Sequence, residues 1–244
     1  MILFISDLHL SPRSPGATAL FLRFLAGRAR QAEALYILGD LFEVWVGDDI
    51  DDAYHTAIIS ALRAASDAGL KIHLMHGNRD FALGERFAAA AGARLLPDPF
   101  DLVLPEWSFV LSHGDALCLD DPDYTAYRAK VRNPAWLQKM LARPRFFRRQ
   151  LGRYIRWRSR RRKRDRNLVY TDLQPAATDD VIRDHGYATF IHGHTHRAAT
   201  HDHMVDGIHV ERWVLADWHE DRGECLVWDG EALKREALIP ENRP

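Results

Sequence analysis

The sequence predicts an α/β fold with a long helical insertion. Short apolar runs typical of buried strands alternate with segments of helical spacing up to residue 120, and this alternation resumes after residue 172. The chain has 244 residues, 47% of them hydrophobic, so it can bury a sizeable core as one domain with an insertion. No apolar run reaches the roughly 18 residues of a membrane span, and no charged leader precedes the first apolar run. We therefore expect a soluble globular protein.

The first predicted strand, residues 1–5, runs directly into Asp7 and His9. Side chains two residues apart on an extended chain lie on the same face, so both can point to one position. Apolar residues at helical spacing then predict a helix over residues 17–30, which would cover the sheet.

The apolar run at residues 35–43 is the centre of the pattern, because it carries Asp40 at the end of a strand buried on both faces. Ligands bind beyond the carboxyl ends of such strands. The next acids, at positions 48, 49, 51 and 52, favour an exposed loop and the start of a helix, and we assign them no catalytic role. The buried stripe of that helix is predicted to be Tyr54, Ile58, Ala61, Leu62 and Ala65.

Three further apolar runs end in polar residues of the same kind. Residues 71–75 lead into Asn78 and Arg79, a strand pair at 100–104 and 107–112 leads into His113, and residues 188–191 lead into His194 and His196. A single apolar run that ends in polar residues is more often followed by a simple turn. The repetition of this ending at several strands is what indicates a shared site. Helices are predicted over 81–92 and 175–185, and the residues after 196 are expected to close a second sheet.

Residues 121–172 interrupt the alternation and are predicted to be an inserted cap of two or more helices, between catalytic segments 1–120 and 173–244. Although the net charge of the chain is −1, residues 143–166 contain thirteen Lys or Arg and one acid. Such a stretch attracts phosphates, nucleic acid or an anionic membrane. A helix face that is simply exposed to solvent would explain this basic stretch equally well.

The side chains at the five strand ends form a set of oxygen and imidazole donors. The two cysteines, Cys118 and Cys225, are too few for a disulfide framework or a cysteine zinc site, so we expect them to be buried small side chains in a reducing cytoplasm. Donors of this kind suit Mn, Fe or Zn, and seven are too many for one ion, so two ions are implied. The seven are Asp7, His9, Asp40, Asn78, His113, His194 and His196.

The ordered motifs Asp-x-His, Gly-Asp, Gly-Asn-Arg-Asp, His-Gly-Asp and Gly-His-Thr-His resemble those of the calcineurin-like metallophosphoesterases. The resemblance implies a four-layer αββα sandwich of two mixed sheets flanked by helices. It also implies two divalent ions, with Asp40 as the bridging ligand and His192 in a supporting role. One ion would be held by Asp7, His9, Asp40 and His196, and the other by Asp40, Asn78, His113 and His194.

Arg79 departs from the Gly-Asn-His motif of most of that family. A histidine there can protonate a leaving group, whereas an arginine stays charged. The substrate should therefore have a leaving group that needs no proton, such as a phosphate leaving a pyrophosphate. The stretches 39–49, 76–81, 113–118 and 136–138 are accordingly similar to the UDP-2,3-diacylglucosamine diphosphatase family of lipid A synthesis.

This narrower resemblance implies attack of a metal-activated water on the α phosphorus, which gives UMP and 2,3-diacylglucosamine 1-phosphate (lipid X). It implies Mn²⁺ as the metal, with Arg79, Asn78 and Asp40 as the catalytic residues. The cap would hold the acyl chains and bind an anionic membrane, so a peripheral monomer at the cytoplasmic face of the inner membrane is expected, without a nucleic-acid partner. At Lys163 the family more often has a small polar residue, and at Arg166 a lysine. The implied substrate contacts are Asn78, Arg79, Asp121, Tyr124, Arg156, Ser159, Lys163, Arg166 and His194.

Two other functions fit parts of the sequence. In a nuclease or nucleotide phosphodiesterase, the cap arginines would bind a nucleic-acid backbone, while Tyr154 and Trp157 would stack on bases. A non-catalytic membrane adaptor on the same fold would be expected to have lost ligand positions, and all seven are present.

Overall fold

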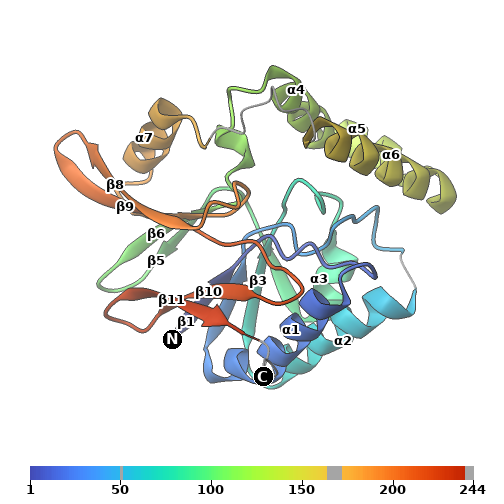
Figure 1. The fold of residues 1–244 in the computed structure, drawn as a ribbon, viewed down its shortest axis with the longest axis horizontal. Coiled ribbons are helices and arrows are strands. Elements are labelled where there is room, and N and C mark those ends of the chain that lie inside the picture. The colour runs from blue at the N-terminus through green and yellow to red at the C-terminus, as the bar shows by residue number, and fades with distance from the viewer. Residues whose placement is uncertain (50–51, 164–171, 240–244) are drawn as a thin grey trace.

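Two mixed β-sheets packed face to face form the centre of the molecule (Figure 1). The computed structural model describes residues 1–49, 52–163 and 172–239, apart from the side chains of 158–160, 162 and 163. The six-stranded sheet has the order β11-β10-β1-β2-β3-β4, and the five-stranded sheet has the order β5-β6-β7-β9-β8. The strands of the first sheet are β1 (Ile2–Ile5), β2 (Ala34–Ile37), β3 (Lys71–Met75), β4 (Ala93–Leu96), β10 (Gly223–Trp228) and β11 (Leu233–Leu238). Those of the second are β5 (Phe100–Val103), β6 (Ser108–Ser112), β7 (Thr189–His192), β8 (Ala199–Val205) and β9 (Ile208–Val214).

Helices cover the outer faces of both sheets. The first sheet packs against α1 (Pro15–Ala26), α2 (Ala53–Asp67) and α3 (Glu85–Ala91), and the second against α7 (Pro175–Asp184). Three more helices lie between β6 and β7 in the chain and stand above the sandwich in Figure 1. These are α4 (Pro122–Val131), α5 (Pro134–Leu141) and α6 (Arg145–Lys163). The predicted four-layer fold is therefore confirmed.

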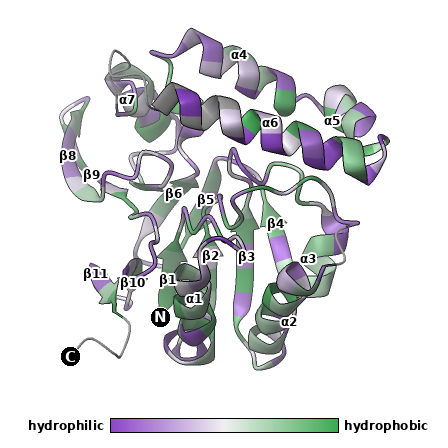
Figure 2. Cartoon of the chain, turned by 45° about the vertical axis from the view of Figure 1, so that its right-hand side comes forward, coloured by the Kyte–Doolittle hydropathy of each residue, from purple (hydrophilic) through white to green (hydrophobic). Residues whose placement is uncertain are grey.

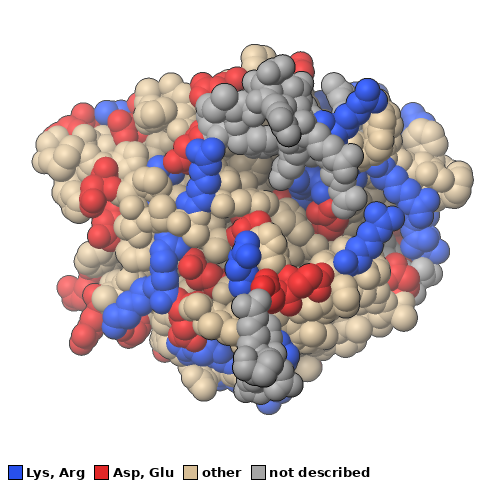
Figure 3. Space-filling view, viewed as in Figure 1, with Lys and Arg blue, Asp and Glu red and all other residues tan. Residues whose placement is uncertain are grey.

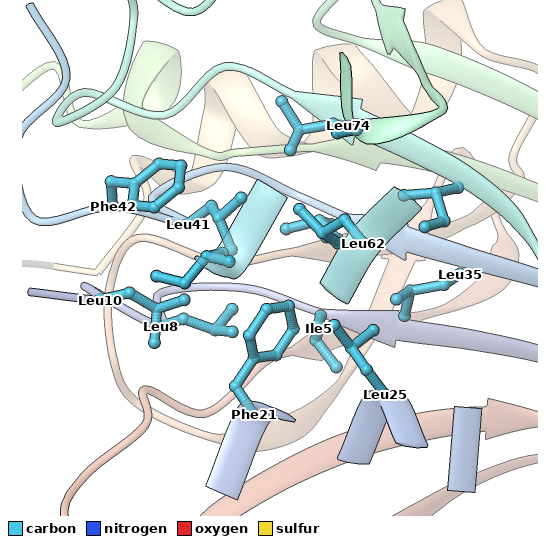
Figure 4. Close-up of a cluster of buried hydrophobic side chains, with 14 of the residues drawn as sticks. Ile5, Leu8, Leu10, Phe21, Leu25, Leu35, Leu41, Phe42, Leu62 and Leu74 are labelled. Carbon is cyan, nitrogen blue, oxygen red and sulfur yellow. The ribbon is translucent and has the colours of Figure 1, made fainter. Parts of the chain in front are cut away.

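The period-2 pattern of the central strands divides the core into layers. Leu3 and Ile5 of β1 face the helices, whereas Phe4 of the same strand faces the second sheet. Figure 2 shows these central strands mostly as hydrophobic. Figure 4 shows the helix-facing cluster, in which Leu8 and Leu41 continue the core beyond the strands. Leu8 lies between Asp7 and His9, and Leu41 follows Asp40, so burying these two leucines fixes the loops that carry the predicted ligands.

Some element predictions need correction. The chain after residue 196 does not only close the second sheet, because β10 pairs antiparallel with β1 and so brings β11 into the first sheet. Strand β4 was not predicted. Helix α3 begins at Glu85 rather than Phe81, because Asp48 accepts hydrogen bonds from the amides of Gly84 and Phe87 and so caps this start. Asp48 is therefore a helix cap supplied from a distant loop.

The remaining helix predictions agree more closely with the structure. Asp52 accepts a hydrogen bond from the His55 amide as the N-cap of α2, as the acidic cluster suggested. Helix α1 ends at Ala26, and a short 3₁₀ turn at Arg28–Gln31 takes up the rest of the predicted segment. No helix within the described residues is long and apolar enough to cross a membrane.

Candidate metal centre and adjoining cavity

The seven predicted ligands lie in five loops, each directly after a strand. Asp7 and His9 follow β1, Asp40 follows β2, and Asn78 follows β3 in the first sheet. His113 follows β6, and His194 and His196 follow β7 in the second. The parallel strands of each sheet end at a common edge, and the two edges meet, so residues far apart in sequence converge.

Asp7, His9 and His196 form one half of the centre. Oδ1 of Asp7 is 3.3 Å from Nε2 of His196 and 3.8 Å from Nε2 of His9, and the two Nε2 atoms are 3.3 Å apart. Oδ1 of Asp7 is buried and accepts no hydrogen bond from the described residues. A carboxylate oxygen and two ring nitrogens thus converge, and with neutral imidazoles they form a donor set that a bound cation stabilises.

Asp40, Asn78, His113 and His194 form the other half. Oδ1 of Asn78 lies 3.1 Å from Nε2 of His113 and 3.0 Å from Nδ1 of His194. Asp40 is 3.8 Å from His113 through Oδ1 and 3.8 Å from His9 through Oδ2, so its carboxylate lies between the two halves. Donor atoms of Asp7, Asp40 and His113 also lie within 4.8 Å of one another. This geometry fits a pair of ions with Asp40 between them.

Buried acidic side chains shift the pKa values of the centre. Asp7, Asp40 and Asp80 are all buried. Burial raises the pKa of Asp40 to about 7, with Asp80 and Asp7 adding to the rise while His113 and Arg79 oppose it. Burial also opposes ionisation of Asp7, but its contacts with His196, His113 and His9 hold that pKa well below its usual range. Bound cations would offset this buried negative charge.

Hydrogen bonds to the second ring nitrogen orient two of the histidines. Nδ1 of His113 donates to the carbonyl oxygen of Leu38 at 2.9 Å, and Nδ1 of His196 donates to Asp217 at 3.0 Å, so each Nε2 is directed into the centre. Burial disfavours the charged form of His196, but Asp217 and Asp7 outweigh it and raise its pKa to about 9. Loss of hydration instead lowers the pKa of His194 to about 3. No sequence signal marked Asp217.

His192 has a supporting position, as the resemblance implied. Burial lowers its pKa to about 3, so the ring is neutral. Nδ1 donates to the carbonyl oxygen of Gly193 at 2.8 Å, and Nε2 accepts from Arg212 at 3.0 Å. Arg212 also pairs with Asp172, which lies where the chain returns from the insertion. The ligand loop after β7 is thus tied to the base of the cap.

A cavity of about 620 Å³ adjoins the centre under the cap. Asp40, Asn78, Arg79, His194 and His196 line one part of it. The apolar walls come from the loop after β2 and from the cap helices, and include Val44, Trp45, Phe81, Trp136, Met140, Leu151 and Ile155. A ligand with both a charged group and long apolar chains fits such a lining.

Two contact regions hold the cap on the sandwich. Arg148 of α6 is buried, donates to the carbonyl oxygen of Val46 at 2.6 Å and pairs with Asp49. Arg156, one of the predicted substrate contacts, pairs with Glu43, whose other oxygen lies 3.6 Å from Nδ1 of His9. Glu43 therefore joins the cap to the metal centre, a role that sequence reasoning missed.

Helix α4 makes the second contact region. Arg132 donates to the carbonyl oxygens of His76 at 3.1 Å and Gly77 at 3.2 Å, in the loop that carries Asn78 and Arg79. Asp115 is buried, and it accepts a hydrogen bond from the Tyr124 hydroxyl at 3.1 Å and pairs with Arg128 at 3.1 Å. Asp115 was not among the predicted site residues, although the His-Gly-Asp motif contains it.

The predicted substrate contacts are distributed around the cavity. Arg79 lies 3.6 Å from Asp40, and Asp121 caps α4 and lines the cavity with Tyr124 and Arg156. Ser159 and Lys163 are on α6, but their side chains lie outside the described part of the structure, as does Arg166 altogether.

Comparisons with known proteins show which family the chain belongs to. The family model for calcineurin-like phosphoesterases matches residues 1–198. A UDP-2,3-diacylglucosamine hydrolase of Aromatoleum aromaticum is 47% identical, covering 93% of both chains. Proteins of that name from Klebsiella pneumoniae and Pseudomonas aeruginosa are 46% and 47% identical, covering 90% and 98% of this chain and 91% and 99% of their own lengths. The chain therefore belongs to the calcineurin-like phosphoesterase family, in the group of these UDP-2,3-diacylglucosamine hydrolases.

Proposed function

We propose that the chain hydrolyses the pyrophosphate bond of UDP-2,3-diacylglucosamine in lipid A synthesis. Water attacks the α phosphorus, and UMP and 2,3-diacylglucosamine 1-phosphate are released. The observation that carries the proposal is the continuity of the oxygen and imidazole centre with a cavity of apolar walls, which suits a lipid-linked diphosphate. The activity named for the three relatives supports the same substrate.

The centre is suited to two divalent ions, for which we propose Mn²⁺. Asp7, His9, Asp40 and His196 would hold one ion, and Asp40, Asn78, His113 and His194 the other. Oxygen and imidazole donors without a thiolate favour such an ion. When bound, the ions lower the pKa of the attacking water and neutralise charge on the phosphate.

Arg79 is proposed to stabilise the phosphate in the transition state. Its guanidinium lies at the cavity wall, 3.6 Å from Asp40, where it supplies a fixed positive charge. It cannot give up a proton, and a leaving phosphate needs none. Asn78 and His194 line the same cavity and would orient the same group.

The cap, residues 121–172, is proposed to hold the glucosamine and its acyl chains. Its helices supply the apolar walls that face Trp45 and Phe81. The remaining proposed substrate contacts are Asp121, Tyr124, Arg156, Ser159, Lys163 and Arg166.

The outer side of α6 is proposed to bind an anionic membrane. Phe146 and Trp157 are 73% and 55% exposed, and exposed arginines such as Arg153 and Arg161 lie among them. In Figure 3, Lys and Arg side chains gather where Figure 1 places α5 and α6. Aromatic and basic side chains on one helix are typical of interfacial binding. We propose a peripheral monomer at the cytoplasmic face of the inner membrane, with no nucleic-acid partner.

The test is UMP release from UDP-2,3-diacylglucosamine measured beside UDP-GlcNAc, with Mn²⁺ or with EDTA. Turnover should require the acyl chains and should be lost with EDTA and restored by Mn²⁺. Equal turnover of both substrates would indicate a general nucleotide hydrolase. Activity that persists in EDTA would remove the metal centre from the mechanism.

A further inference from the structure

We propose that Glu43 is a positioning residue of the metal centre, whose carboxylate orients the ring of His9 so that Nε2 of this ring can bind the ion. This inference rests on the proposed function, since it concerns the same pair of ions. Neither the motifs nor the resemblance gave Glu43 a role, although it lies only three residues after Asp40.

The orientation of the His9 ring is the observation behind this proposal. Nε2 of His9 lies 3.3 Å from Nε2 of His196 and 3.8 Å from Oδ1 of Asp7, so it faces the centre. Nδ1 of the same ring lies 3.6 Å from Oε2 of Glu43 and 3.8 Å from Oδ2 of Asp40. Because Asp40 is the proposed bridging ligand, Glu43 is the carboxylate that can accept a hydrogen bond from Nδ1 while both ions are bound.

His113 and His196 show the same arrangement in a completed form. In each ring Nε2 faces the centre, while Nδ1 donates to an oxygen outside it, the Leu38 carbonyl oxygen for His113 and the Asp217 carboxylate for His196. Histidines that bind metals generally donate their second N–H to such an oxygen, which fixes both the ring and its tautomer. Glu43 supplies the corresponding oxygen for the third ring, although a hydrogen bond there needs an approach of about 0.5 Å.

The carboxylate of Glu43 is held at this place from two sides. The Glu43 amide donates to the Leu10 carbonyl oxygen at 3.1 Å, and the Leu10 amide donates to the Leu41 carbonyl oxygen at 2.9 Å, so its loop is fastened to the loop of His9. Oε1 of Glu43 pairs with Arg156 of α6, which leaves Oε2 directed toward the ring. The cap therefore helps to hold the group that orients a metal ligand.

Glu43 is not suited to act on the substrate directly. It is absent from the described residues that line the cavity, and its negative charge would repel the phosphates. Its effect on the reaction therefore has to pass through His9.

The experiment measures Mn²⁺ binding to the metal-free protein by equilibrium dialysis, with no substrate present. Glu43→Asp keeps the charge but shortens the side chain by one methylene group, and the backbone bond to Leu10 prevents the loop from following. The affinity for one of the two ions should fall by about 10- to 100-fold, the usual effect of losing an orienting partner. Glu43→Ala should cause a similar loss. Circular dichroism confirms that each variant is folded.

Arg156→Ala separates the orienting role from the attachment of the cap. This change removes the ion pair with α6 but leaves the carboxylate of Glu43 beside His9. It should change the Mn²⁺ affinity much less than either Glu43 variant.

Glu236→Asp is the matched control for the shortened side chain. Glu236 pairs with Arg28, which also contacts Met1, so it lies at the end of β1 away from the ligands. Its substitution should leave the Mn²⁺ affinity unchanged.

Three results would overturn the proposal. Unchanged Mn²⁺ affinity in both Glu43 variants would show that the carboxylate has no part in metal binding. A loss in Glu43→Ala alone, with wild-type affinity in Glu43→Asp, would assign the effect to charge and not to orientation of the ring. Equal losses in Arg156→Ala and Glu43→Asp would show that Glu43 acts through the cap. If the wild-type chain bound Mn²⁺ but released no UMP, the proposed function would fail, while these affinities would still decide the role of Glu43.

Discussion

Five predicted metal ligands, Asp7, His9, Asp40, His194 and His196, have positive φ angles between 49° and 67°. This backbone conformation costs a residue other than glycine about 1–3 kcal/mol and persists only where the surrounding structure imposes it. Here the loops after β1 and β2 bond to each other, since the Asp7 amide donates to the Gly39 carbonyl oxygen and the His9 amide to that of Asp40. Backbone hydrogen bonds between these loops therefore position the side chains of the predicted metal ligands. The same-face argument from the sequence predicted that Asp7 and His9 lie near each other, as they do, but the loop conformation and not strand alternation brings them together.

Arg79→Ala should lower kcat/KM by about 10²–10³-fold, the usual effect of removing one donor to transition-state charge. Metal content should be unchanged, because Asp40 is bonded to the backbone amide of Arg79 at 2.8 Å and not through that side chain alone. Arg79→Lys should restore only part of the loss, since an ammonium lacks the planar fork. Kinetics beside elemental analysis test this, and an Ala variant with most of its activity would exclude the phosphate role.

Asp217→Asn should weaken metal binding by about 10- to 100-fold, because Asp217 orients the ring of His196 through Nδ1. Equilibrium dialysis against Mn²⁺ measures the change. Asp229→Asn is the matched control, since this carboxylate pairs with Lys234 on the β10–β11 hairpin. Equal metal affinity in both variants would show that Asp217 has no part in holding the ion.

At the scale of elements, the arginines of α6 fall into two groups. Arg148 and Arg156 point to the sandwich and pair with Asp49 and Glu43. Gly152 lies between them, where an added Cβ would be 3.0 Å from the side chains of Val44 and Val46, so the helix packs closely there. The basic stretch is therefore neither wholly a solvated face nor wholly a membrane surface, a division that charge counting could not reveal.

Arg153→Glu combined with Arg161→Glu should weaken binding to anionic vesicles several-fold, because both side chains are exposed on the outer side of α6. Hydrolysis of detergent-dispersed substrate should change little. Arg148→Glu should do the reverse, lowering stability and activity, since it places a second acid beside Asp49 and loses the bond to Val46. Vesicle sedimentation and kinetics separate the two groups. Equal losses of hydrolysis in both would place the outer arginines at the substrate.

At the scale of the whole molecule, the sequence predicted what depends on local pattern. The strand ends at residues 7, 40, 78 and 113 were visible because each apolar run stops at a polar residue. Strand β4 was not visible, since its Ala-Arg-Leu-Leu follows a helix of similar composition. The pairing of β10 with β1 is a long-range contact that no local signal encodes. Asp217 and Glu43 were missed for the same reason, because their roles exist only after distant loops meet.

The Asp172–Arg212 pair joins the base of the cap to the sandwich, and it should make stability depend on pH. Although burial opposes ionisation of Asp172, its bonds to Arg212 and to the Leu173 amide lower its pKa to about 2, against roughly 3.9 in an unfolded chain. A pKa that is lower in the folded state contributes stability that is complete above about pH 5 and is lost as the pH falls through about 2.

Asp172→Asn lacks this contribution at every pH. At pH 7 it should be less stable than the wild type by ~1–3 kcal/mol, because Arg212 is buried and loses its charged partner. The difference in the free energy of unfolding between the variant and the wild type should narrow as the pH falls from about 5 to 3, where the wild-type carboxylate begins to take up its proton. Urea unfolding across this range measures it. A constant difference would mean that the variant acts through packing and not through the charge of Asp172.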